Sequence, residues 1–190
     1  AIGLNSLEDI QQQFMNGQVI TCVTVVVKYL GDDGKLVKEE IALVSDHRAQ
    51  DSCMTECVTR KLMAIFAKRG RIIKNVIFKS DNCKVQFKSA ENYNDMYEWT
   101  HSFVTLFDGT VMKVMTMVRC FGVAMHGKCE CDSLGALIGA TVQKARLNNL
   151  IVDCAAHIVS LFQTRTDNAS GYVGTKTKFA KLTVVEITAA

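Results

Sequence analysis

Two aspartates stand where an α/β protein commonly carries its chemistry. Asp81 directly follows the short apolar run IIKNVIF, residues 72–78. Asp132 comes after a second apolar run that ends near Phe121, and it opens a helical stretch. Because sites in open α/β sheets form at the carboxyl ends of strands, we expect both carboxylates at one edge of the sheet. Such a pair can hold Mg²⁺ or Mn²⁺ for attack on a phosphodiester, although Asp81 also fits a turn and Asp132 a helix cap.

The stretch FGVAMHGKCECDSLGALIGATVQKA, residues 121–145, is the most specific pattern in the chain. His126 and Lys128 flank a glycine a few residues before the second aspartate. Gly135 and Gly139 then stand inside an expected helix, at a cost of up to about 1 kcal/mol each relative to alanine. Two such glycines indicate close approach of either the sheet or a phosphate backbone.

The elements that would position these residues follow from hydrophobic periodicity, because the chain contains no proline to mark boundaries. The β-branched run VITCVTVVVKY is typical of a strand buried on both faces. The expected order is a hairpin of strands 19–29 and 36–45, a helix from Asp51 or Ser52 to Gly70, a strand over 72–78, a helical stripe over 90–107, a strand over 111–121, helices from 132 and over 151–162, and a weakly indicated strand over 181–188. This order predicts an α/β fold with an antiparallel hairpin and parallel additions.

The pairing of SDNCKVQFKS, residues 80–89, with HGKCECDSLGALIG, residues 126–139, resembles the catalytic core of eukaryotic DNA-transposon-derived transposases. That core belongs to the integrase-like superfamily and has a ribonuclease-H-like fold. The resemblance extends from about residue 10 to 145. It implies a single domain over residues 1–190, whose mixed sheet combines an antiparallel hairpin with parallel strands and is flanked by helices. Residues 150–190, with a poorly indicated helix and strand, lie outside it.

Carried over to the matching positions, the resemblance implies metal-dependent DNA cleavage and strand transfer, as in DNA recombination. Asp81 and Asp132 would be the ligands of Mg²⁺ or Mn²⁺. His126 and Lys128 would lie beside the scissile phosphate. The expected nucleic-acid contacts are Gln86, Lys88, Lys84 and Lys144. DNA is thus the expected partner, in the nucleus or the cytoplasm, and a homo-oligomer is compatible with the pattern.

The chain departs from the family's pattern at two points. Asn82 replaces the usual glycine after Asp81, which changes the geometry of the turn but not its charge. The family also has a first metal-binding aspartate on an opening strand before the hairpin, whereas no strand aspartate precedes Val19. Asp9, in the polar segment LEDIQQQF, is a poor substitute. We therefore expect the chain to begin after that strand and to be inactive as an enzyme by itself.

Two other interpretations fit the same residues. The first is a catalytically inactive, transposase-derived nucleic-acid-binding domain, which the absent first acid favours. The second is a zinc-stabilised structural domain with His126, Cys129 and Cys131 as ligands, joined by Cys120 or Cys83. Against it, the Cys-x-Cys spacing is tighter than the gap usual in zinc sites.

Composition limits the function classes. The 190 residues carry a net charge of +3, which excludes a strongly basic DNA-binding arm but not a local basic groove. The eight cysteines lie mostly in apolar, periodic stretches, which favours reduced thiols over a disulfide framework. The longest apolar run, residues 19–27, has about half of the roughly 20 residues that a membrane-spanning helix needs. We therefore expect an intracellular protein without a membrane segment.

Overall fold

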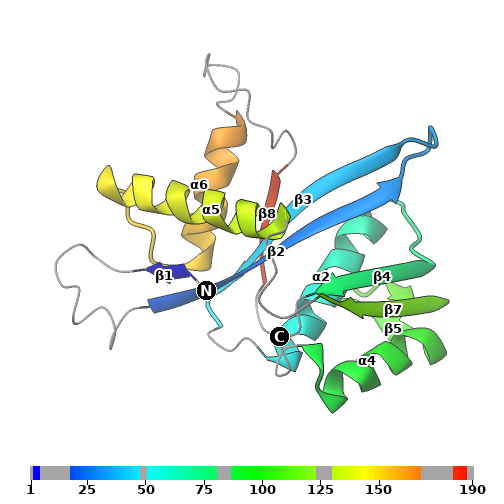
Figure 1. Cartoon of the computed structure of the whole chain (residues 1–190). Coiled ribbons are helices and arrows are strands. Elements are labelled where there is room, and N and C mark those ends of the chain that lie inside the picture. Colours follow the sequence, from blue (N-terminus) through cyan, green and yellow to red (C-terminus); the bar gives the residue numbers. More distant parts are fainter. Residues whose placement is uncertain are drawn as a thin grey trace. The chain divides into compact units, whose positions relative to one another are not determined.

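The computed structural model describes residues 2–4, 18–47, 51–80, 87–122, 130–167 and 182–187 of the chain. The chain divides into two compact units. The hairpin unit comprises Ala1–Arg48 together with Lys128–Ala190, and the central unit comprises Ala49–Gly127. Each unit has its own β-structure (Figure 1). Each also has its own hydrophobic cluster.

A four-stranded sheet forms the framework of the hairpin unit. Its strands are β1 (Ile2–Leu4), β2 (Gln18–Leu30), β3 (Leu36–Ser45) and β8 (Leu182–Glu186), in the order β1-β2-β3-β8. β1 and β2 are antiparallel, as are β2 and β3, while β8 runs parallel to β3. In the turn between β2 and β3, Gly34 has a φ of 74°, which glycine adopts without strain. The expected hairpin is therefore confirmed.

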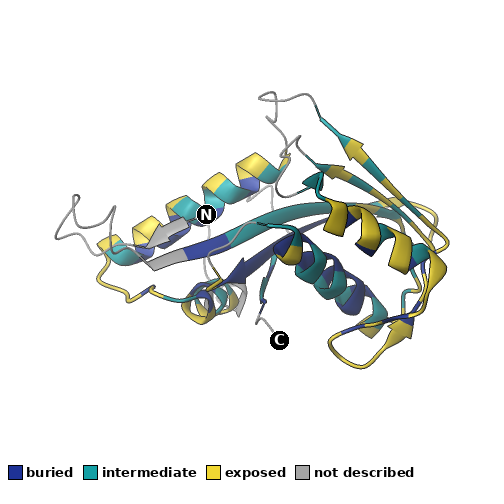
Figure 2. Ribbon diagram, turned by 90° about the horizontal axis from the view of Figure 1, so that it is seen from below, coloured by how far each residue is buried: buried dark blue, intermediate teal, exposed yellow. Residues whose placement is uncertain are grey.

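Burial within this hairpin differs from the sequence expectation. β2 is only half-buried from Cys22 to Val27, although its β-branched run predicted a strand buried on both faces. β1 pairs with β2 only up to Ile20, so the described part of β2 beyond that point has one open edge. β3, with neighbours on both sides, is buried from residue 39 to 45 (Figure 2).

Two helices cover one face of the sheet in the hairpin unit. α5 (Glu130–Leu147) and α6 (Ala155–Asp167) bury aliphatic side chains in the same cluster as β2, β3 and β8. α5 starts two residues earlier than expected, and α6 starts four residues later than expected. The buried members of the cluster are Ile20, Ala42, Val44, Leu134, Ile138, Val142, Ala145, Val152, Ala155, Ile158 and Val184.

The helices of the central unit begin at side-chain caps. α2 (Ser52–Lys68) starts where the Asp51 carboxylate accepts a hydrogen bond from the Met54 N–H at 3.0 Å. α4 (Ala90–His101) is capped by Ser89. The helix expected over 90–107 ends at His101, so the prediction is wrong for the residues after it. Its last part instead forms the short strand β5 (Val104–Thr105), because Val104 is buried in the central cluster.

Two parallel strands, β4 (Asn75–Ser80) and β7 (Thr116–Phe121), form the parallel pair of the central unit. The single strand expected over 111–121 is instead two strands. Its first part, Val111–Met112, forms β6, which pairs antiparallel with β5, and its last part forms β7. Between β6 and β7, the Val114 N–H donates to the Trp99 carbonyl at 3.0 Å, and Val114 is fully buried. This contact takes the backbone out of the strand.

The coarse fold prediction is confirmed. The described chain is a mixed α/β structure with an antiparallel hairpin, parallel strand pairs and flanking helices. The ribonuclease-H-like identity stays a prediction. Among the described helices, none combines the length and the apolar character that crossing a membrane requires.

Candidate functional site

The two motif-bearing segments leave the parallel pair from the same end. Ser80 and Phe121 are register partners and the last residues of β4 and β7. The Gly122 N–H donates to the Ser80 carbonyl at 2.8 Å, so the chain still runs beside β4 after β7 ends. The segment with Asp81 and the segment with His126 therefore start next to each other. This end of the parallel pair is the candidate functional site.

The predicted site residues divide into those that the structure describes and those that it does not. Asp132 is exposed in the first turn of α5, and Lys144 is exposed in its last turn. Lys88 lies in the central unit, partly buried, directly before the cap of α4. The remaining predicted residues, Asp81, Lys84, Gln86, His126 and Lys128, lie outside the described residues. The shared metal site of Asp81 and Asp132 thus stays a prediction.

Around Asp132, the first turn of α5 carries a network of ion pairs within the hairpin unit. The Glu130 carboxylate lies 3.1 Å from Lys28 Nζ and 3.0 Å from Lys38 Nζ. Lys38 Nζ also lies 3.1 Å from the carboxylate of the buried Glu40. Hydrogen bonds from Lys38 and Lys28 lower the pKa of Glu130, and those to Glu130 and Glu40 raise the pKa of Lys38. The cations near Asp132 are therefore largely neutralised by carboxylates.

In contrast, cations at the carboxyl end of the parallel pair rest on aromatic rings. The Arg119 guanidinium carbon lies 5.3 Å from the ring centroid of Phe78 and 5.6 Å from that of Phe87. Lys88 Nζ lies 4.6 Å from the ring centroid of Phe121. All three distances fall within the roughly 6 Å over which a ring face attracts a cation. These five residues are referred to as the cation–aromatic cluster.

Arg119 keeps donor capacity within this cluster. Its Nε atom is buried and has no hydrogen-bond partner among the described residues. Burial lowers the pKa of Arg119, while the charges of Asp95 and Tyr93 act in the opposite direction. An arginine stays protonated even so, because its pKa lies far above neutrality. A buried cationic donor without an acceptor favours an incoming anion such as a phosphate oxygen.

The two helix glycines of the motif are not required by close packing. A Cβ atom built on Gly135 would meet Thr24 Cγ2 at 3.9 Å, an ordinary contact distance. A Cβ atom on Gly139 would meet no described atom within 4 Å. Of the two expected alternatives, close approach of the sheet is therefore wrong, close approach of a phosphate backbone stays a prediction, and alanine would fit at both positions.

The zinc ligands that the sequence offered are only partly described. Cys120 is exposed on β7, and Cys131 is partly buried in the first turn of α5, where its carbonyl accepts from Thr24 Oγ1 at 3.0 Å. His126, Cys129 and Cys83 lie outside the described residues. A different group, Asp153, Cys154 and His157, brings three ligand types together at the start of α6.

Sequence reasoning identified Lys88 but missed the other members of the cation–aromatic cluster. Arg119 sits in the strand TMVRCF, where it shares the half-buried face of β7 with Met117 and Phe121. An arginine on the inward-facing side of a strand is a readable signal, because burying its charge requires a partner. The identity of that partner, a pair of phenylalanine rings, depends on the pairing of β4 with β7 and was not readable.

Comparisons with known proteins give a family without a function. The chain belongs to the family described as Domain of unknown function (DUF8701), which matches residues 4–186. No curated protein and no solved structure matches the chain.

Proposed function

We propose that the chain is a nucleic-acid-binding domain of transposase-like, ribonuclease-H-like type, which contacts DNA at the carboxyl end of the parallel pair and does not cut it. The observation that carries this proposal is the cation–aromatic cluster. It places Arg119 and Lys88 beside the point where the segments with the transposase-like motifs leave β4 and β7.

The chemistry of the cluster suits a nucleic-acid strand. Two cations can neutralise phosphates and release counterions, which supplies most of the affinity in sequence-independent binding. Arg119 has an unpartnered Nε donor among the described residues, and arginine is well matched to phosphate oxygens. Aromatic rings beside the cations can stack on bases, as in single-strand binding grooves. With a net charge of +3, we expect weak binding that falls steeply with added salt.

We infer that the domain does not cleave DNA because the first metal-binding aspartate of the transposase-like pattern is missing. A two-metal site needs enough carboxylates to hold both ions next to the phosphodiester. In the transposase-like pattern, the first aspartate belongs to a strand ahead of the hairpin. A strand does precede the hairpin in the chain, in contrast to the expectation that the chain begins after it: β1 pairs with β2, and its residues Ile2, Gly3 and Leu4 include no acid.

The binding proposal is tested by fluorescence anisotropy with labelled single- and double-stranded DNA over a range of salt concentrations. We expect Arg119→Gln to weaken binding about tenfold and to reduce the slope of log K against log salt by about 1. Lys79→Gln is the matched control, because Lys79 is exposed on the alternate face of β4. Equal losses in both variants, or no DNA binding by the wild-type chain at low salt, would contradict the proposal.

Metal-dependent cleavage is the second candidate, and the adjacent ends of β4 and β7 favour it. Parallel strands in register deliver their following segments to one edge, where Asp81 and a second acid could hold Mg²⁺ or Mn²⁺. A plasmid-nicking assay with each ion separates the candidates. We expect no nicking. If the wild-type chain nicks the plasmid and Asp81→Asn and Asp132→Asn abolish the nicking, the domain is a nuclease and the proposal of binding without cleavage is wrong.

A further inference from the structure

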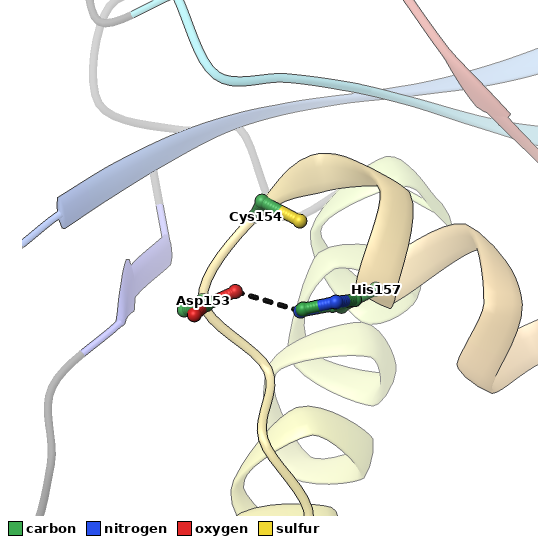
Figure 3. A group of neighbouring side chains, drawn as sticks. All are labelled: Asp153, Cys154 and His157. Carbon is green, nitrogen blue, oxygen red and sulfur yellow. Dashed lines mark ion pairs between the residues drawn. The ribbon is translucent and has the colours of Figure 1, made fainter.

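Three metal-ligating side chains converge at the start of α6 in the hairpin unit. One ligand atom each from Asp153, Cys154 and His157 lies within 4.8 Å of the others. The Asp153 carboxylate and His157 Nδ1 are 2.7 Å apart (Figure 3). In a tetrahedral zinc site, bonds of about 2.0–2.3 Å place ligand atoms about 3.5 Å apart. Small side-chain rotations would therefore bring the three atoms around one ion.

The backbone that carries these ligands is anchored on both sides. Val152, Ala155 and Ile158 are buried in the core of the hairpin unit, and in the sequence they stand directly before, between and directly after the three ligand residues. The Ala155 N–H donates to the Asp46 carboxylate at 2.8 Å, which fixes the first turn of α6 to the end of β3. A ligand set held by buried neighbours pays little entropy on metal binding.

The ligand side chains remain reachable from solvent. The side chains of Asp153 and His157 keep 57% and 46% of their exposed area, and Cys154 is half-buried. An ion can therefore enter without opening the core, and a water molecule can complete its coordination.

We propose that Asp153, Cys154 and His157 form a zinc-binding site with three protein ligands and one open position. The donor set decides the metal. Thiolate and imidazole ligands suit Zn²⁺, whereas Mg²⁺ and Mn²⁺ prefer oxygen ligands. The site is thus chemically distinct from the carboxylate site expected for phosphodiester chemistry.

Binding exchanges protons for the ion. Zn²⁺ takes the Cys154 thiolate, so the thiol proton leaves to solvent, and it replaces any proton on the His157 Nδ1 that faces Asp153. The affinity for Zn²⁺ should therefore decrease as the pH is lowered, because protons compete with the metal for the ligand atoms. Because the three ligands span the start of α6, zinc should also stabilise the folded hairpin unit.

Cobalt titration of the full chain, followed by optical absorption, tests the site. Co²⁺ replaces Zn²⁺ and reports a thiolate ligand through a sulfur-to-cobalt charge-transfer band. We expect one band-forming ion per chain, displaced by added Zn²⁺. We expect Cys154→Ser to abolish the band and His157→Gln to weaken metal binding by at least about tenfold. Asp153→Asn should also weaken binding, since an amide is a poorer metal ligand.

Two control variants keep the test specific. His101→Gln removes an exposed histidine of the central unit and should leave the titration unchanged. The double variant Cys129→Ser, Cys131→Ser removes the zinc ligands that the sequence pattern offered and should also retain the band. The proposal is overturned if the wild-type chain shows no band, if Cys154→Ser keeps it, or if only the double variant loses it.

Discussion

The two units of the chain stabilise their cations in different ways. In the hairpin unit, Lys28 and Lys38 pair with Glu130 at the surface. In the central unit, Arg119 and Lys88 instead lie over the aromatic rings of the cation–aromatic cluster. Arg60 likewise lies 5.9 Å from the Trp99 ring centroid, although it also pairs with Glu56.

This difference decides where an anion can bind. A cation paired with a carboxylate has its charge cancelled nearby, and exposed pairs add little stability. A cation on an aromatic face keeps its full charge, because the ring attracts it without neutralising it. The central unit is therefore the better place for a phosphate, and the hairpin unit the better place for a metal held by its own ligands.

The largest expected effect concerns Trp99 in the hydrophobic cluster of the central unit. Trp99 is fully buried, and its Nε1 donates to the Asp95 carboxylate at 3.1 Å. We expect Trp99→Ala to lower the free energy of unfolding by about 3–5 kcal/mol, through the cavity and the lost hydrogen bond. Urea denaturation followed by far-ultraviolet circular dichroism measures it. Tyr97→Ala, 62% exposed on the same helix, should change it by less than about 0.5 kcal/mol; similar losses would contradict the central role of Trp99.

A smaller effect of defined pH dependence is expected at Asp95. Burial, assisted by the charge of Glu56, raises the pKa of Asp95 to about 6. Between the usual carboxyl pKa and 6, the folded state holds a proton that the unfolded state has released. The contribution of Asp95 to the free energy of unfolding is therefore greatest at low pH. It decreases by about 1–3 kcal/mol in total as the pH rises towards 6.

The variant Asp95→Asn separates this charge from its hydrogen bond, since an amide oxygen can still accept from Trp99 Nε1. We expect it to raise the free energy of unfolding by about 1–3 kcal/mol at pH 7 and to flatten the dependence between pH 4 and 6. Urea titrations at several pH values measure both. A loss of stability at pH 7 would show that the ionised carboxylate is required.

The smallest expected effect concerns the surface ion pairs of the hairpin unit. Lys28 and Glu130 have side chains that are 52% and 48% exposed. We expect Lys28→Met to change the free energy of unfolding by less than about 1 kcal/mol, and less still in high salt. A double-mutant cycle with Glu130→Gln isolates the pair. A coupling as large as the effect of Trp99→Ala would remove the contrast between the units.

Local sequence patterns predicted most of the elements. The hairpin, α2 and the parallel pair follow from apolar periodicity and from turn residues such as Gly34 and Gly70, both of which have positive φ. The errors lie where a distant contact overrides the local pattern. The strand over 111–121 breaks because the Trp99 carbonyl takes the Val114 N–H.

For the candidate sites too, some features could be predicted from the sequence and others could not. The transposase-like motifs were readable, and so were the adjacent positions of the segments that follow β4 and β7, because carboxyl ends of parallel strands share an edge. Asp153, Cys154 and His157 are close in sequence, so the spacing Asp-Cys-x-x-His is itself a readable metal-ligand pattern.

By itself, the sequence determined the hairpin, α2, α5 and β4, because each of these elements depends on the periodicity, caps or turn residues of a short stretch. Only the tertiary structure decided that Arg119 lies over the rings of Phe78 and Phe87, since Arg119 is far from both in the chain and lies opposite Phe78 through the register of β4 and β7. The same holds for Asp46, which reaches the Ala155 N–H across more than a hundred residues. Local propensity acts over a few residues, whereas burial and charge pairing depend on whatever the fold brings near.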